Sequence, residues 1–241
     1  MKLSSRGIVL HTINYSETSL VVKIYTEQSG MGSFIVSGVR SKKGKFSTSH
    51  FQPLTLIEFN ALGKPGQSML RITDVHLAPP FSGIPGDMIK STIALFIAEV
   101  IYRSVREEEV NPSLFNFLHN GIQFLDLSHN NCARFHIYFM IQFSRYLGFY
   151  PNGIFISDTS YFDLREGLFR NDKPVHADFF DIVQTATLYK LMNSSFDNFH
   201  EAAIPAAISK TLLYGLVTYF EIHQTHGHQI RSHKVLEEVL S

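Results

Sequence analysis

The chain has 241 residues, a length that fits one large domain or two small ones. Its hydrophobic fraction of 44% is enough for a packed core, and the 21 lysines and arginines balance the 21 aspartates and glutamates. The single cysteine, Cys132, excludes an intramolecular disulfide and any zinc site built from several cysteines. The sequence has neither a signal-peptide pattern nor a run of about 18 apolar residues, so we expect a cytoplasmic protein without a membrane span.

The zero net charge hides an asymmetry between the two halves of the chain. Residues 1–78 contain nine cations and four acidic residues, whereas residues 79–241 contain twelve cations and seventeen acidic residues. Such a contrast indicates two domains with different tasks, one of them contact with nucleic acid. We therefore predict a nucleic-acid-binding domain over 1–78 and a second domain over 79–241.

Five strand-like runs fill the first of these domains. The run from Leu20 to Thr26 shows the period of two most clearly, because Leu20, Val22 and Ile24 face one side of the strand. The five runs cover residues 7–13, 20–26, 33–37, 54–60 and 68–77. Short strands with a longer break between the third and the fourth predict an OB-fold, a small Greek-key barrel. An SH3-like barrel would give much the same pattern.

Beyond Pro79-Pro80 the hydrophobic period changes to that of helices. Predicted helices cover residues 87–106, 111–127, 131–147, 178–193 and 205–224, and a last one begins near 232. Gly148 is expected to end the third helix. Residues 149–177 interrupt the helical pattern with short strand-like runs at 154–157, 161–163 and 168–170. The expected fold class is therefore α+β, an N-terminal five-stranded OB-fold barrel followed by a mostly helical domain with a small β-hairpin insertion near 150–177.

A cluster of cations lies in the break between the third and fourth strands, over Gly38–Lys45. Exposed cations on the rim of a small barrel are suited to contact the phosphates of DNA or RNA. The residues predicted to do so are Arg40, Lys42, Lys43 and Lys45, with Arg6 and Lys23 nearby on the barrel. A run of charges more often forms only a solvated loop. The barrel and the local positive charge together favour nucleic-acid binding.

Aromatic side chains can add a surface on which bases stack, as single-strand-binding barrels commonly do. We predict this role for Tyr15, Tyr25 and Phe46, and expect Phe34 and Phe51 to lie in the core. The alternative is that all of these rings are buried.

Four histidines near the C-terminus, His223, His226, His228 and His233, have a spacing that resembles a metal site. Gly227 is expected to end the preceding helix and so to separate them, and no cysteine or aspartate nearby completes a ligand set. We therefore expect no metal and no cofactor. The sequence also lacks the glycine-rich nucleotide-binding motifs and the nucleophile elbow, so we expect a protein that is not an enzyme. A histidine-metal hydrolase remains the enzymatic alternative.

The predicted helix over 131–147 is rich in aromatic residues on more than one face, which indicates burial in a helical bundle. An arginine beside an apolar groove can hold a short peptide that ends in carboxylates. We predict such a groove around Arg134, Tyr138 and Arg145, with ordinary core packing as the alternative.

The order and spacing of several segments resemble the RecO family of bacterial recombination mediators. The resemblance begins with Gly7–Thr26 and continues through the basic loop at Gly38–Lys45 and the Gln52-Pro53-Leu54 entry to the fourth strand. It extends through Leu147-Gly-Phe-Tyr-Pro151 and Leu213-Tyr-Gly to Arg231-Ser, and so covers nearly the whole chain. No single motif is highly specific, but their combination is.

The resemblance implies an N-terminal OB domain, a helical C-terminal domain and a role in DNA repair. Members of this family bind single- and double-stranded DNA and anneal complementary strands. They engage the acidic C-terminal tail of single-stranded DNA-binding protein, and with RecR they help to load RecA. DNA contact then maps to the basic loop, and the tail groove maps loosely to the helix that carries Arg134. The resemblance also implies a location at the nucleoid.

One departure from the family concerns zinc. Many members carry four cysteines after the Leu-Gly-Tyr-x-Pro stretch, whereas residues 152–163 of this chain contain none. We therefore expect no zinc, and an apolar hairpin over 154–169 in its place. An OB-fold RNA-binding factor remains the alternative among binding proteins.

Overall fold

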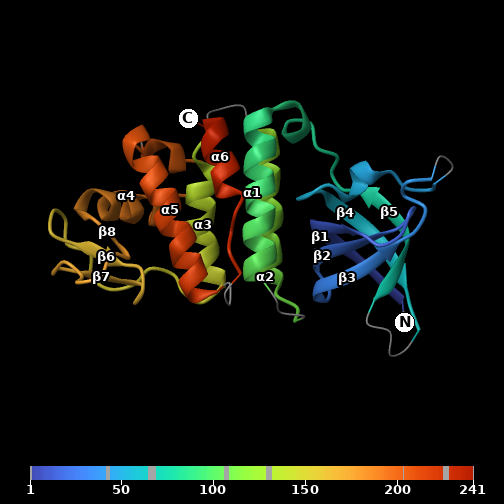
Figure 1. The fold of residues 1–241 in the computed structure, drawn as a ribbon, viewed down its shortest axis with the longest axis horizontal. Helices are drawn as coiled ribbons and strands as arrows, with labels where there is room; N and C mark the ends of the chain where they lie inside the picture. The colour runs from blue at the N-terminus through green and yellow to red at the C-terminus, as the bar shows by residue number, and fades with distance from the viewer. Residues whose placement is uncertain are drawn as a thin grey trace. The chain divides into compact units, whose positions relative to one another are not determined.

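Figure 1 shows the computed structural model, which describes residues 2–41, 44–64, 69–105, 109–128, 132–202, 204–224 and 228–240. The chain divides into two units. The first comprises residues 1–87 and 97–126, and the second comprises residues 88–96 and 127–241. One helix, α1 (Met88–Ser104), therefore contributes to both units.

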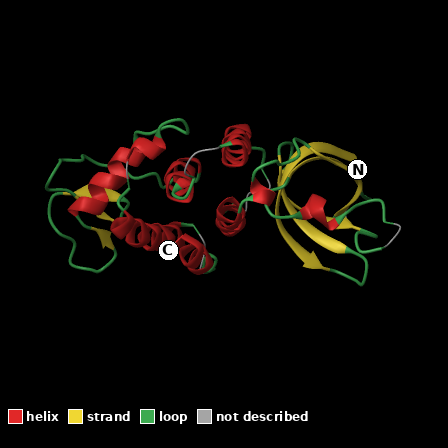
Figure 2. Cartoon of the chain, turned by 90° about the horizontal axis from the view of Figure 1, so that it is seen from above, coloured by secondary structure: helices red, strands yellow, loops and turns green. Residues whose placement is uncertain are grey.

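A closed five-stranded barrel forms the larger part of the first unit, as the ring of strands in Figure 2 shows. Its strands are β1 (Lys2–Asn14), β2 (Leu20–Thr26), β3 (Gly30–Val36), β4 (Leu56–Leu62) and β5 (Leu70–Leu77). They follow one another around the barrel in the order β1-β2-β3-β5-β4. β3 and β5 run parallel, with Phe34 opposite Leu70, whereas the other pairs are antiparallel. The predicted OB-fold class is confirmed.

The barrel interior is filled by alternate side chains of all five strands, including Val9, Val22, Phe34, Phe59 and Ile72. Strand alternation sends the intervening side chains to the outside. The expectation that Leu20, Val22 and Ile24 share one face of β2 is confirmed, because all three belong to this core.

Part of the outer face of the barrel is buried as well. Ile8 and Tyr25 lie on the outer face but are only 0% and 1% exposed. The ring of Tyr25 lies 6.3 Å from that of Phe115, on helix α2 (Pro112–Leu127). α2 and the C-terminal half of α1 thus cover one side of the barrel, where they bury outward-facing apolar side chains of β1 and β2.

The segment after the barrel is anchored by Asp126, near the C-terminal end of α2. Its carboxylate accepts hydrogen bonds from the backbone N–H groups of Ser82, Gly83 and Ile84, at 3.0, 2.8 and 2.7 Å. Burial acts to raise the pKa of Asp126, but these hydrogen bonds outweigh it, so the pKa lies below its usual value. The short linker expected from Ser82 to Gly86 is therefore a fixed turn, which ends in the 3₁₀ helix Ile84–Gly86.

The second unit is built around α3 (Phe135–Tyr146), in which all residues from Phe135 to Ser144 are buried. It packs against α4 (Ile182–Met192) and α5 (Ala206–His223), and α6 (His233–Leu240) packs on α5. α3 begins four residues later than expected. Cys132 consequently precedes the helix rather than lying in it, and it is buried.

A small three-stranded sheet completes this unit, in the order β7-β6-β8. β6 (Tyr161–Asp163) and β7 (Leu168–Arg170) have the predicted bounds. The strand predicted over 154–157 is wrong, because these residues form no strand, and the third strand is instead β8 (Phe179–Phe180). No helix in the described parts of the chain is long and apolar enough to cross a membrane.

Candidate nucleic-acid interface

The basic loop, residues 38–45, leaves the end of β3 and folds back on itself. Gly38 has a φ of 74° and its carbonyl accepts a hydrogen bond from Ser41 N–H at 3.1 Å, while Gly44 N–H donates to Ser41 O at 2.9 Å. A Cβ atom added to Gly44 would lie well under 3.0 Å from the Gly38 carbonyl oxygen. The two glycines thus allow the loop ends to meet. Lys42 and Lys43 lie outside the described residues.

Arg40 joins this loop to the turn between β1 and β2. Its guanidinium donates a hydrogen bond to Asn14 Oδ1, although the two residues are 26 positions apart. The turn next to Asn14 carries Tyr15, whose side chain is 61% exposed. A cation and an open aromatic face therefore belong to neighbouring segments, the combination that single-stranded nucleic acid requires.

Lys45 lies on the outer side of β5. Its ammonium is 2.9 Å from Asp74 Oδ1 and donates to the Thr73 carbonyl at 2.9 Å. It also lies 5.3 Å from the centre of the Phe46 ring. The side chain of Lys45 is 64% exposed, so solvent reaches the ion pair.

Arg71 is a cation of this surface that the sequence analysis missed. It is exposed on β5, opposite Ile35 of β3, and its guanidinium donates to Ser37 Oγ at 2.7 Å. Ser37 directly precedes the basic loop. The alternation of Arg71 with the inward-facing Leu70 and Ile72 is a sequence signal that would have placed it on the outside of the barrel.

Arg6 is held on the helix-covered side of the barrel instead. Its guanidinium donates two hydrogen bonds to the Glu27 carboxylate, at 2.9 and 2.6 Å, and lies 5.4 Å from the centre of the Phe115 ring on α2. The hydrogen bond from Arg6 holds the pKa of Glu27 below its usual value. Arg6 therefore has structural partners that a DNA phosphate would have to replace.

Lys23 is half-buried, and its ammonium donates to Ser33 Oγ at 2.6 Å on the neighbouring strand. His11, which is opposite Lys23 in the strand pairing, stacks at 4.9 Å on Tyr102 of α1. Burial and the nearby cations Arg103 and Lys23 lower the pKa of His11. Lys23 thus bonds to β3 on one side and is paired on the other with a residue that packs on α1.

Two of the three aromatic residues predicted to stack on bases do not offer an open ring. Tyr25 is 1% exposed beneath α2, and Phe46 is 9% exposed within the barrel core, in edge contact with Phe51. These two predictions are wrong, because burial leaves no ring face for a base. Tyr15 remains a candidate.

The three residues predicted to form a peptide groove do not lie together on α3. Arg134 is at the N-cap and Arg145 in the last turn, about 16 Å apart along the axis at about 1.5 Å per residue. Tyr138 is 3% exposed, stacks on Phe199 at 5.1 Å, and burial raises the pKa of its hydroxyl to about 12. The prediction that Tyr138 lines an open groove is wrong.

The polar side chains of this region bind the end of α4 instead. Gln142 Nε2 donates to the carbonyls of Leu191 and Met192, at 3.1 and 3.2 Å, and Tyr150 OH donates to Met192 O at 3.1 Å. The last carbonyls of a helix have no partner within it, so these donors satisfy them. The guanidinium of Arg145 lies 4.4 Å from the centre of the Tyr150 ring.

The C-terminal histidines are spread over separate environments. His223 Nε2 lies 2.9 Å from the Leu164 carbonyl, His233 is 7% exposed beside Tyr214, and His228 is exposed. His226 lies outside the described residues. Within the described ranges, no three His, Cys, Asp or Glu side chains are placed to hold a metal ion together.

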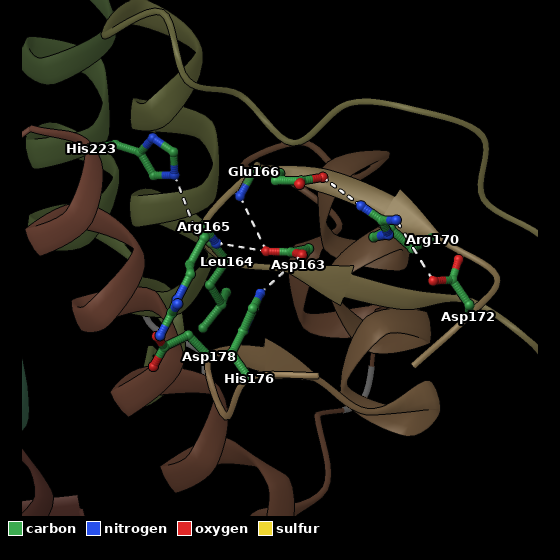
Figure 3. A network of polar contacts seen from close by, with 9 residues as sticks. All are labelled: Asp163, Leu164, Arg165, Glu166, Arg170, Asp172, His176, Asp178 and His223. Carbon is green, nitrogen blue, oxygen red and sulfur yellow. Dashed lines mark hydrogen bonds and ion pairs between the residues drawn. The ribbon is translucent and has the colours of Figure 1, made fainter. Parts of the chain in front are cut away.

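Where the cysteines are missing, a polar network shapes the turn between β6 and β7 (Figure 3). The buried Asp163 carboxylate accepts hydrogen bonds from the N–H groups of Arg165 and Glu166, at 2.9 and 3.1 Å, and lies 3.2 Å from His176 Nε2. The Arg165 side chain extends the network, because its Nε donates a hydrogen bond to Asp178 Oδ2 at 2.7 Å. Hydrogen bonds and ion pairs thus hold the hairpin in place.

Comparison with known proteins identifies the family. The model of the RecO N-terminal domain, "Recombination protein O N terminal", matches residues 1–81, and that of the C-terminal domain matches residues 85–231. The chain is 36% identical over 235 residues to the DNA repair protein RecO of Phocaeicola vulgatus, covering 98% of each chain. It is 37% identical over 234 residues to that of Bacteroides fragilis, with 97% of each chain covered. It is also 36% identical over 245 residues to that of Flavobacterium psychrophilum, with both chains fully covered. Two family models that match consecutive parts of the chain, and relatives aligned over nearly their whole length, show that the chain belongs to the RecO family.

Proposed function

We propose that this protein is a recombination mediator in DNA repair, which binds single- and double-stranded DNA on the rim of its barrel. The observation that carries the proposal is that cations of two segments, Arg40 and Lys45 of the basic loop and Arg71 of β5, gather around this loop. Arg40 binds Asn14, next to the exposed Tyr15, and Arg71 binds Ser37, which precedes the loop. Lys42 and Lys43 extend the same loop in sequence. Membership of a family named for DNA repair supports DNA as the polyanion.

The chemistry of this surface is binding rather than catalysis. Cations that replace counter-ions along a DNA backbone bind in a sequence-independent and salt-dependent manner. Two strands captured on such a surface lose part of their mutual repulsion, which favours pairing. We propose that the protein anneals complementary strands in this way, without hydrolysing a nucleotide, and that it works at the nucleoid.

The helical unit would supply the protein partners. We propose that it engages the acidic tail of single-stranded DNA-binding protein through Arg134 and Arg145, either of which can pair with a carboxylate. Arg145 is exposed and Arg134 half-buried. With RecR, the protein would then promote the loading of RecA on the released strand. These partners come to the proposal from the family resemblance.

A single annealing experiment tests both parts. Complementary strands are coated with single-stranded DNA-binding protein, with or without its C-terminal tail, and annealing is followed by fluorescence in the absence of nucleotide. The proposal expects tail-dependent annealing by the wild-type chain, and loss of annealing in Arg40→Ala/Arg71→Ala. Annealing of naked strands alone would contradict the proposed binding of the acidic tail by the helical unit. If the chain instead binds structured RNA more tightly than DNA, the RNA-binding alternative is the better description.

The salt dependence of DNA binding measures how many phosphates the proposed surface contacts. Each lost phosphate contact lowers the log–log salt slope by about 0.7 on single strands. Arg40→Ala/Arg71→Ala should therefore reduce the slope by about 1.4, at roughly 0.7 for each residue. An unchanged slope would mean that these arginines do not contact the backbone.

A further inference from the structure

The ion pair between Lys45 and Asp74 places an acidic residue within the proposed DNA-binding surface. Asp74 is on β5, and its second carboxylate oxygen lies 3.0 Å from His76 Nε2. The hydrogen bond from Lys45 is the main reason that the pKa of Asp74 lies below its usual value. The carboxylate is therefore ionised at neutral pH and competes with any other anion that approaches Lys45.

From this geometry we propose that Asp74 is an internal counter-ion, which competes with DNA phosphate for Lys45 and thereby limits the affinity of the surface. The inference rests on the proposed function. An ammonium group has three donors, and Lys45 already directs its Nζ to Asp74 and to the Thr73 carbonyl. A phosphate must displace the carboxylate or share the ammonium with it, against the repulsion between the two anions.

The exposure of the pair makes this exchange feasible. The side chains of Lys45 and Asp74 are 64% and 35% exposed, and exposed pairs of this kind are weak and readily broken. The pair between Arg6 and Glu27 differs, because two hydrogen bonds and the Phe115 ring fix its geometry. The Arg6–Glu27 pair is thus held by its surroundings, whereas an incoming anion can replace the Lys45–Asp74 pair.

The competition predicts a gain of affinity when the carboxylate is neutralised. Asp74→Asn keeps the shape of the side chain but removes the charge, so Lys45 becomes fully available to phosphate. We expect DNA binding to tighten about 3- to 10-fold at low salt, and the salt slope to rise by up to about 0.7, the value for one phosphate contact. The proposal requires that this gain in affinity depend on the presence of Lys45.

A double-mutant cycle with the full chain separates this route from general repulsion. Binding of a fluorescent single-stranded oligonucleotide is measured by anisotropy over a salt series, for wild type, Asp74→Asn, Lys45→Ala and the double variant. The matched control is Glu58→Gln, because Glu58 is an exposed carboxylate on β4 that lies directly opposite His76 of β5. Thermal unfolding of each variant verifies the fold, and Asp74→Ser provides a second neutral side chain.

The expected result is tighter binding by Asp74→Asn in the wild-type background, little change in the Lys45→Ala background, and a smaller gain for Glu58→Gln. Equal gains in both backgrounds, or none, would overturn the inference. Loss of DNA binding in Arg40→Ala/Arg71→Ala within the same assay, with no response to Asp74→Asn, would leave the proposed function intact. If wild type does not bind DNA at all, both proposals fail.

Discussion

Arg6 and Glu27 form a bidentate ion pair between β1 and the turn that follows β2, and the Arg6 guanidinium also lies over the Phe115 ring of α2. His119, also on α2, has a pKa lowered chiefly by its burial and further by the nearby Arg6. The pair therefore joins the barrel to the helix that covers it. Arg6, predicted from its charge to bind DNA, thus has partners within the first unit.

This role predicts that Arg6→Ala reduces stability rather than DNA binding. The free energy of unfolding, measured with urea, should fall by about 1 kcal/mol, the upper range for a partly exposed ion pair. DNA affinity should change by less than about 2-fold, since no phosphate contact is lost. Arg71→Ala is the matched control and should show the opposite pattern. A large loss of DNA affinity in Arg6→Ala would return this residue to the binding surface.

The closed form of the basic loop predicts that Gly44→Ala weakens DNA binding. The added methyl group would lie too close to the Gly38 carbonyl oxygen, so the loop must open and its cations must move. We expect a loss of several-fold in DNA affinity with an unchanged midpoint of thermal unfolding. Gly86→Ala is the control, because a Cβ atom there meets nothing within 4 Å. Equal behaviour of the two variants would show that the loop shape does not matter.

Asp126→Asn is expected to destabilise the first unit by about 1–3 kcal/mol, because an amide has a single acceptor oxygen and so leaves at least one of the N–H groups of residues 82–84 without an acceptor. The ionisation of Asp126 also makes the stability of the first unit depend on pH. A carboxylate with a lowered pKa contributes stability above its unfolded value of about 3.9, and this contribution is lost as pH falls through the folded pKa. Urea unfolding at pH 7 and pH 3 measures both effects. Asp172→Asn, whose side chain is 78% exposed, should change neither.

Burial of His136 is expected to cause a second loss of stability on acidification, in a higher pH range than that of Asp126. It is 1% exposed on α3, and burial, with a contribution from Arg134, lowers its pKa to about 3. In the unfolded chain His136 takes up a proton near pH 6.5, whereas in the folded protein it stays neutral to much lower pH. The free energy of unfolding therefore decreases as the pH is lowered through about 6.5, by about 2 kcal/mol between pH 7 and pH 5.

Urea unfolding of His136→Gln at these two pH values tests this. The variant should lose most of the pH dependence, whereas the exposed control His228→Gln should keep it. An unchanged pH dependence in His136→Gln would assign the effect to other groups.

Local patterns of the sequence predicted much of the fold. The bounds of β2, β6 and β7 follow from the period of two and from flanking turns, and are confirmed. Gly148, with a φ of 84°, ends α3 as expected. Residues 154–157 are as apolar as a strand but have no strand partner, and β8 has only two residues, too few to show a period. The domain boundary at residue 78 stays a prediction.

The candidate site was only partly predictable, because its geometry depends on distant residues. Tyr25 alternates like an outward residue, and nothing in its neighbourhood reveals that α2 covers it. Arg71 meets Ser37 across 34 positions, through the pairing of β5 with β3. Likewise, the charge of Lys45 is visible in sequence, but its neutralisation by Asp74, 29 positions later, is not. Sequence identified the cations of the basic loop but not Arg71, and tertiary structure decides which of them are available.

The parallel pairing of β3 with β5 has a consequence for biosynthesis. During translation β1, β2 and β3 emerge first and can form a meander, but the second edge of β3 stays unpaired until β5 has left the ribosome. An open strand edge is a site for unwanted association with other chains. The basic loop emerges during the same interval, so the nascent chain would expose cations and an adhesive edge together in a cell rich in RNA. Closure by β5 removes that edge and brings Arg71 beside the loop in the same step.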